Sequence, residues 1–338
     1  PSLFCSRMVS PPKERTSVMR FWSISFFLCA TILSGAEKPG LLVVKGASGT
    51  PEYGGSFDKW FESWRSVSEK AGMDFTEVGK GLIGGQKKFL QDFFRNVPKQ
   101  GIQPLWVVLI GHGTYNGKEA KFNLIGPDLE AKELAEWLEP FDRPLVVINC
   151  SSCSAPFLSH LSGKGRILIT ATRSGHERNF CHFGGFFPLA LMDSSADLDK
   201  DDQTSLLEAW LLATRRTNDF YVKEGRLPTE HSLLDDNGDG KGTQGDWYSG
   251  LRLTKRSAEE NLLPDGLRAH QIHVQSSEED RKLSPEKRKL RDKLELKMAV
   301  LRAKKKDMKE ADYYLNLEKL LLEMGRVYLP AKTAEGAP

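Results

Sequence analysis

Two short apolar runs, residues 105–110 and 145–148, constrain the fold of this chain more than any other feature. The first ends in Gly111-His112-Gly113, and the second ends in Asn149-Cys150-Ser151-Ser152-Cys153-Ser154. Runs of four to six residues that are rich in β-branched side chains and bounded by glycine or proline are typical of strands buried on both faces of a parallel sheet. The sequence therefore predicts two such strands, each followed by a turn with reactive side chains.

The segment between the two runs determines how the strands pair. Residues 129–138 are polar with regularly spaced leucines, and this pattern predicts a helix that crosses over the sheet. A strand–helix–strand unit places its two strands parallel and close together in one sheet. Because ligands collect at the carboxyl ends of such strands, we expect His112 and Cys150 at one sheet edge, as a candidate base and nucleophile.

The rest of the body follows the same alternation of strands and helices, which predicts an α/β fold with a mostly parallel sheet flanked by helices. Aromatic residues at helical spacing in 57–71 indicate a side that faces the core rather than a ligand box. The further expected strands are 41–44, 73–78, 122–125 and 166–171, and the further expected helices are 57–71, 86–97, 155–161 and 206–221.

The order and spacing of these motifs over residues 41–221 resemble the caspase/legumain-like cysteine peptidases. His112-Gly113 matches the His-Gly of that family, and Cys150-Ser151-Ser152-Cys153-Ser154 matches its cysteine turn, with Cys153 where a glycine is usual. The resemblance implies a caspase-like fold and hydrolysis of protein or peptide substrates. It further implies that His112 is base and acid, Cys150 the nucleophile and Gly113 an oxyanion donor, chemistry that requires a thiolate beside an imidazole.

The register of the cysteine turn stays open at the level of sequence. Cys153 becomes the working thiol if the second strand ends later than residue 148. A shift of two residues instead places Ser152 at the nucleophile position, which describes a caspase-like fold without an active thiol. The polar turn 172–179 is expected at the same edge, where Arg173, Glu177 and Arg178 are candidates for a pocket wall.

Two acidic stretches, 197–208 and 235–246, have the spacing of the twelve-residue EF-hand calcium loop. Calcium prefers six to eight hard oxygen ligands, and the loop supplies them from positions one, three, five, seven, nine and twelve. The first stretch lacks the turn glycine and has Asp202 there, whereas the second has Gly240. The expected ligands are Asp197, Asp199, Asp201, Gln203, Ser205 and Glu208 in the first loop, and Asp235, Asn237, Asp239, Lys241 and Asp246 in the second.

Composition and the terminal segments set the remaining expectations. With 48 Lys and Arg against 45 Asp and Glu, the formal charge of +3 gives no reason to expect nucleic acid. Residues 1–36 are predicted to be an upstream extension plus a signal peptide of about 19–36, with an uncleaved anchor as the alternative. Export to a secreted or periplasmic location follows, with no stable membrane span after cleavage, since the apolar run 21–33 is too short for one.

The C-terminal part separates from the body by composition. We expect a caspase/legumain-like domain over 37–251, a linker over 252–283, and a helical hairpin or coiled-coil tail over 284–330 that can contact a protein partner. Binding of a membrane surface through its lysines is the alternative use of this tail.

Cysteine usage leaves one further alternative for the site. Cys150 and Cys153 form a Cys-x-x-Cys pair that could bind zinc with Cys181 and His182. The sequence thus predicts an exported, calcium-binding, caspase-like cysteine endopeptidase. The competing interpretation is an inactive, calcium-stabilised scaffold of the same fold.

Overall fold

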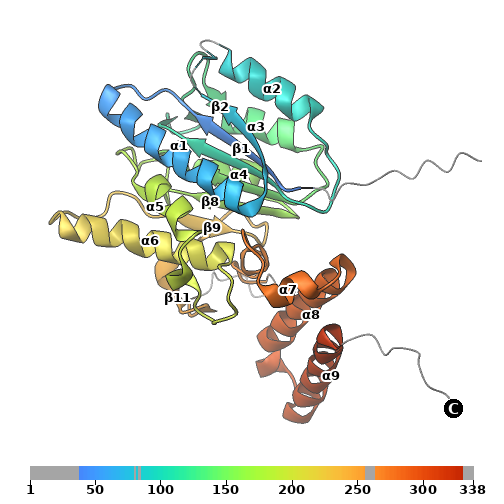
Figure 1. Cartoon of the computed structure of the whole chain (residues 1–338). Helices are drawn as coiled ribbons and strands as arrows, with labels where there is room; N and C mark the ends of the chain where they lie inside the picture. Colours follow the sequence, from blue (N-terminus) through green and yellow to red (C-terminus); the bar gives the residue numbers. More distant parts are fainter. Residues whose placement is uncertain (1–37, 80, 83–84, 256–262, 330–338) are drawn as a thin grey trace, which may run out of the picture. The chain divides into compact units, whose positions relative to one another are not determined.

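A seven-stranded sheet forms the centre of the computed structural model, which describes residues 38–79, 81–82, 85–255 and 263–329 (Figure 1). The strand order is β10-β9-β8-β7-β3-β1-β2. Strands β2, β1, β3, β7 and β8 are mutually parallel, while β9 and β10 are antiparallel to their neighbours. This confirms the predicted α/β class with a mainly parallel sheet. The strands are β1 Gly40–Lys45, β2 Asp74–Val78, β3 Leu105–Ile110, β7 Leu145–Asn149, β8 Arg166–Thr170, β9 Leu233–Asp235 and β10 Thr243–Gln244.

Helices cover both faces of this sheet, so the molecule has two hydrophobic cores. The helices α1, α5 and α6 pack on one face and α2, α3 and α4 on the other. The central strands β3 and β7 are buried at every position, which explains why their sequences are uninterrupted apolar runs. The helices are α1 Pro51–Ala71, α2 Gln86–Asn96, α3 Ala131–Leu138, α4 Pro156–Leu161, α5 Phe183–Ala190 and α6 Leu206–Lys223.

Helix α1 shows how local sequence fixes an element that borders the site. Thr50 caps its first turn, Pro51 occupies the first helical position, and Gly72 closes it in the left-handed conformation. The helix therefore begins at Pro51, six residues before Phe57, where the predicted apolar pattern starts. Its buried side, which includes Trp64, packs into the core as the spacing predicted.

A small antiparallel sheet lies directly after β3. It consists of β4 Gly113–Tyr115, β5 Ala120–Phe122 and β6 Leu129–Glu130. The expected hairpin is present, but its second strand covers Ala120–Phe122 instead of 122–125. Asn123 N still donates to the carbonyl of His112, the residue opposite it.

The segment expected to be a linker, 252–283, packs on the body over most of its described length. The Asp236 carboxylate accepts hydrogen bonds from the backbone N–H groups of Gly266, Arg268 and Ala269, and Leu206 N donates to the carbonyl of Ile272 at 2.7 Å. The polar composition of the segment suggested a linker with little regular structure. Its backbone is instead hydrogen-bonded to Asp236 and Leu206 of the body. The described elements of this segment are β12 Arg252–Leu253, the 3-10 helix η3 Ala269–Gln271 and α7 Glu278–Lys282. The 3-10 helix η2 Gly245–Trp247 and strand β11 Tyr248–Ser249 precede it.

The described chain ends in two helices, α8 Pro285–Ala303 and α9 Glu310–Tyr328, joined through the 3-10 turn η4 Lys305–Asp307 (Figure 1). A small apolar cluster holds them together, with Leu294 from α8 and Val327 from α9 buried. Helix α8 has a clear start signal, since Ser284 caps it ahead of Pro285.

Within the described residues, no helix is both long and apolar enough to cross a bilayer. The predicted signal segment lies outside the described residues.

Candidate functional site

The two turns singled out in the sequence meet at one edge of the sheet. Strand β3 pairs with β7 in parallel over Leu105↔Leu145 to Leu109↔Asn149, so both strands end at the same level. His112 and Gly113 follow the end of β3, and Cys150 to Ser154 follow the end of β7. The predicted juxtaposition of the two turns is therefore present.

His112 is held in an orientation that defines its tautomer. Its Nε2 lies 3.1 Å from the carbonyl oxygen of Ser48, which can only accept a hydrogen bond. Nε2 therefore carries a proton, and in the neutral form of the ring Nδ1 is the acceptor. The ring packs edge-on against Tyr53 and Phe57 of α1, with centroid distances of 5.0 and 5.3 Å. No sequence pattern indicated the Ser48 contact, because it is made by a backbone group in the loop after β1.

The Cys150 side chain points into the core beneath helix α5. It is 1% exposed, and a Cβ placed on Gly184 would lie 2.8 Å from the Cys150 Cβ and 3.0 Å from the Trp60 ring. Burial raises the pKa of the Cys150 thiol far above its ordinary value, and the negative charge of Glu230 adds to the effect. At neutral pH this sulfur is therefore a thiol rather than a thiolate.

The other two described cysteines are also buried and reduced. Burial raises the pKa of Cys153, with partial compensation by the charge of Arg178, and burial raises that of Cys181 further. Cys153 adopts φ of 54°, in the region that favours glycine, which fits its position where the family has glycine. Among the described residues, the one His/Cys/Asp/Glu group with ligand spacing lies elsewhere, so the zinc alternative gains no support.

Ser152 is the residue of the cysteine turn that faces Gly113. Gly113 N donates to Ser152 Oγ at 3.2 Å, and Ser152 Oγ lies 3.2 Å from the Gly113 carbonyl, to which it can donate. A Cβ on Gly113 would lie 2.2 Å from the Ser152 carbonyl oxygen, so only glycine allows this approach.

The first acidic loop gathers carboxylates before the amino end of α6. Ligand oxygens of Asp197, Asp199 and Glu208 lie within 4.8 Å of one another. Asp202 takes φ of 62° at the position where EF-hands have glycine, so an aspartate makes the sharp turn. Burial, followed by the charges of Asp201 and Glu208, raises the pKa of Asp199. A cation at this cluster would remove that repulsion.

Ser205 and Glu208 also have a structural role in this loop. Ser205 caps α6, and Glu208 Oε2 accepts from Ser205 N at 2.9 Å while its Oε1 accepts from Leu198 N at 2.7 Å. Gln203 is bonded through its side chain to Asp201 at 2.9 Å. The exit helix therefore starts directly after loop position nine, and the loop is closed by its own hydrogen bonds.

The second acidic loop joins β9 to β10 instead of two helices. Asp235 accepts from Gly238 N at 3.0 Å and Gly240 N at 2.9 Å, and Gly240 has φ of 72°. In the same way, the Asn237 side chain accepts a hydrogen bond from Asp239 N, and the Asp239 side chain accepts one from Lys241 N. The expected last ligand, Asp246, is exposed and lies 3.6 Å from Lys255. Within the described residues this loop therefore lacks a cluster of three carboxylates.

A carboxylate from the expected linker closes the second loop instead. Asp265 accepts from Asp236 N at 3.0 Å, from Asn237 N at 3.1 Å and from the Thr243 hydroxyl at 2.6 Å. Burial raises the pKa of Asp265 to about 7. Spacing within one loop could not reveal this residue, because it lies nineteen positions after the last residue of the loop, Asp246.

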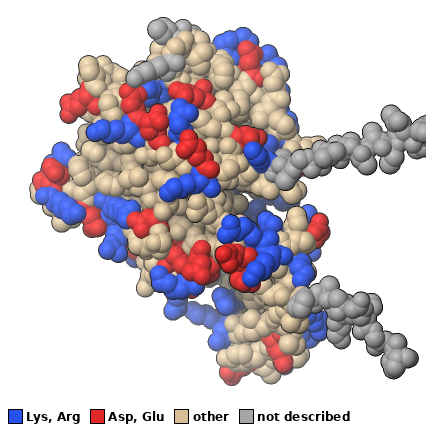
Figure 2. Space-filling model, viewed as in Figure 1, with Lys and Arg blue, Asp and Glu red and all other residues tan. Residues whose placement is uncertain are grey.

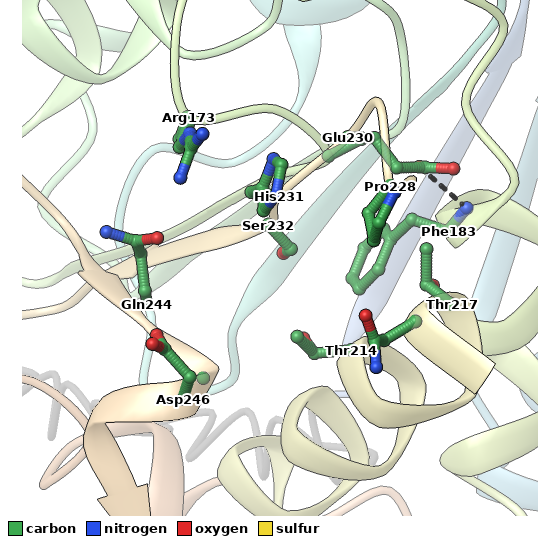
Figure 3. Close-up of a pocket in the computed structure, with 13 residues that line it drawn as sticks. Arg173, Phe183, Thr214, Thr217, Pro228, Glu230, His231, Ser232, Gln244 and Asp246 are labelled. Carbon is green, nitrogen blue, oxygen red and sulfur yellow. Dashed lines mark hydrogen bonds between the residues drawn. The ribbon is translucent and has the colours of Figure 1, made fainter. Parts of the chain in front are cut away.

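A cavity of about 330 Å³ opens at the carboxyl end of β8, between the residues that follow this strand, helix α6 and the chain before β9 (Figure 3). His231 lines it, and its Nδ1 lies 2.6 Å from Glu177, which also pairs with Arg173 at 3.3 Å. Glu230, the residue before His231, also lines the cavity and accepts from Phe183 N at 3.1 Å (Figure 3). The turn 172–179 therefore contributes to a pocket wall through Arg173 and holds His231 through Glu177.

Arg178, the third candidate in that turn, is exposed and does not line this cavity. His231 and Glu230 were not foreseen, since isolated residues before a short strand carry no motif.

Comparisons with known proteins add a general likeness of fold. No protein-family model matches the chain, and no curated protein sequence matches it. Among solved structures it is similar to the crystal structure of the Drosophila initiator caspase Dronc, with a TM-score of 0.40 and 13% identity over 71% of this chain and 94% of that one. It is also similar to protein GSU0716 from Geobacter sulfurreducens, with a TM-score of 0.40 and 12% identity over 59% of this chain and 93% of that one. At these values neither likeness carries an argument about activity.

Proposed function

We propose that this protein is a calcium-stabilised scaffold with a caspase-like fold that binds a protein or peptide without cleaving it through a thiol. The observation that carries the proposal is the contact of the Ser152 hydroxyl with Gly113, where the related peptidases need a free oxyanion donor beside a thiolate.

Two physical effects work against thiol catalysis at this edge. Cys150 is enclosed by Trp60 and Gly184, and desolvation keeps its sulfur protonated. The Gly113 N–H already donates to Ser152, so it would have to exchange that partner before it could stabilise an oxyanion.

Calcium at the first acidic loop is part of the same proposal. Asp197, Asp199 and Glu208 offer three carboxylates at one point. The carbonyl of Gln203 would add a fourth of the six ligands expected of a twelve-residue loop. The second loop is the weaker candidate, because Asp246 is turned to Lys255. Export, which we also infer from the signal segment, would expose the protein to calcium outside the cell.

One observation favours a second candidate function, a cysteine endopeptidase with His112 and Cys150. The bond from His112 Nε2 to Ser48 leaves Nδ1 as an acceptor, which is the form a general base requires. Catalysis would then need a second conformation in which α5 moves away from Cys150.

Labelling of the purified protein separates these functions. We expect dilute iodoacetamide to modify the three described thiols slowly and equally, with no change in the His112→Ala variant. Fast labelling of Cys150 that His112→Ala abolishes would establish the peptidase instead. A fluorophosphonate probe that modifies Ser152 would indicate a serine hydrolase and would also contradict the proposal.

Thermal unfolding tests the metal. Calcium at about 100 times its Kd should add about 2.7 kcal/mol to the stability of the wild-type protein. Asp199→Asn should abolish this gain, and Asp246→Asn serves as the matched control that keeps it. A melting temperature that calcium and chelator leave unchanged would remove calcium from the proposal.

A further inference from the structure

Helix α9 carries two separate apolar stripes, and the hairpin uses only one of them. In the first stripe Tyr313 and Val327 are buried, and Leu320 and Met324 pack with them against the α8 side. The spacing of four and three residues is that of a helix packed on one partner. The first stripe consists of Tyr313, Leu317, Leu320, Met324 and Val327.

The second stripe lies on another side of α9 and faces solvent. Its six large apolar side chains are between 49% and 60% exposed. Figure 2 shows few charged atoms over this helix on the face in view. A soluble monomer usually exposes such residues singly, so five on helix α9, with Leu329 directly after its end, indicate a contact surface. The second stripe consists of Tyr314, Leu315, Leu321, Leu322, Tyr328 and Leu329.

The spacing of the second stripe indicates what kind of surface covers it. Positions 314, 321 and 328 recur every seven residues, and so do 315, 322 and 329. An exact seven-residue repeat is typical of a helix that packs along another helix. Polar residues occupy the remaining face, and they carry both signs, with Asp312 and Glu323 beside Lys319 and Arg326. Such a mixed flank does not favour an anionic membrane surface.

We propose that the second stripe is covered by the same stripe of a second copy of this chain, with the two α9 helices antiparallel. The stripe is symmetric about the midpoint between Leu321 and Leu322. In that register Tyr314 faces Leu329 of the second copy, Leu315 faces Tyr328, and Leu321 faces Leu322. A two-fold interface requires this self-complementarity, because each surface must match itself.

Glu318 determines the orientation of the pair. It lies within the apolar stripe, between Leu315 and Leu322 on the same side of the helix. In a parallel pair Glu318 would face its own copy, which brings two like charges together. In the antiparallel register it faces Gly325, which leaves room for its side chain, and Arg326 follows directly as a partner of opposite charge.

The interface is small, which favours a reversible dimer over a permanent one. Six half-exposed side chains from each chain give a contact at the low end of the range, below about 1,200 Å². We therefore expect a reversible dimer with a Kd on the order of 1–10 µM.

Sedimentation velocity of the full chain, from about 1 to 100 µM, tests the proposal. The wild-type protein should pass from monomer to dimer across this range. Leu322→Glu should raise the Kd at least about thirtyfold, since it places charges at the centre of the interface. The matched control is Asn316→Glu on the polar face, which should leave the Kd unchanged. Because Leu322 is exposed, circular dichroism should report an unchanged fold for the variant.

Charge exchange tests the antiparallel register. Glu318→Arg and Arg326→Glu should each weaken the dimer, and the double variant should restore it. A protein that stays monomeric at 100 µM overturns the proposal, as does a dimer that Leu322→Glu leaves intact. A dimer that Glu318→Ala strengthens would show parallel pairing. Binding of the monomer to anionic vesicles through Leu322 would assign the stripe to a membrane.

Discussion

Glu230 provides a direct test of the electrostatics beside the pocket. Its carboxylate is 3% exposed and accepts hydrogen bonds from His182 N at 2.6 Å, Phe183 N at 3.1 Å and the Tyr221 hydroxyl at 3.0 Å. Desolvation raises the pKa of Glu230, and these donors lower it. Desolvation prevails, and the pKa rises from 4.5 to about 7.

The size and sign of the effect follow from linkage. A rise of this size corresponds to about 3 kcal/mol, at about 1.4 kcal/mol for each pH unit. Because the folded pKa lies above the unfolded one, the native state binds more protons between these values. The contribution of Glu230 to stability is therefore complete below about pH 4.5 and is lost as the pH rises through about 7.

The perturbation is Glu230→Gln, which keeps the shape and removes the titration. Urea unfolding of both proteins, followed by tryptophan fluorescence from about pH 4.5 to about pH 8, gives the free energy of unfolding at each pH. We expect the free energy of unfolding of the wild type to fall by about 3 kcal/mol relative to that of the variant over this range. The variant also loses its bond from Phe183 N, at a cost of about 1–3 kcal/mol that does not depend on pH.

Comparison of the two proteins isolates Glu230, because Asp236 and Asp265, whose pKa values rise to about 6 and about 7, titrate in both. A difference that stays constant with pH would refute the reasoning. If the free energy of unfolding of the wild type instead rises relative to that of the variant as the pH rises, the hydrogen-bond donors lower the pKa of Glu230 by more than desolvation raises it.

Three further predictions concern packing. Gly113→Ala should destabilise the protein by several kcal/mol, since its Cβ would lie 2.2 Å from the Ser152 carbonyl oxygen. The matched control is Gly55→Ala in α1, where a Cβ meets nothing within 4 Å, and it should stabilise the protein by about 0.5–1 kcal/mol. Trp64→Ala should cost about 3–5 kcal/mol in urea unfolding, because this side chain is fully buried; a loss below 1 kcal/mol would contradict the packing. Ser152→Ala should cost about 1 kcal/mol in the same assay, and an unchanged stability would mean that its bonds to Gly113 are weak in solution.

The parallel core of the fold could be predicted because its strands are buried on both faces. Runs such as 105–110 have few alternatives, and the crossover helix between 105–110 and 145–148 then requires parallel pairing. The edge of the sheet could not be predicted in this way. Strands β9 and β10 are short, and they lie within and beside an acidic stretch whose spacing resembles a calcium loop.

The candidate site was predictable in place but not in detail. The order of the motifs put His112 and the cysteine turn at one edge, yet the direction of each side chain depends on where β7 ends. Because β7 extends to Asn149, Cys150 points into the core under α5, and Ser152 reaches Gly113. A shift of one residue in a strand end reverses the face of every side chain after it, and composition does not fix that end.

The attachment of residues 263–283 has a practical consequence for any shortened form of this protein. A chain cut at residue 251, where the composition changes, would deprive the buried Asp236 carboxylate of its three backbone donors and the second acidic loop of Asp265. It would also leave Leu206 N, at the start of α6, without the Ile272 carbonyl. A buried carboxylate stripped of its donors costs several kcal/mol, a large part of the margin that keeps a domain folded. The smallest piece that can be expected to fold on its own therefore extends to about residue 283.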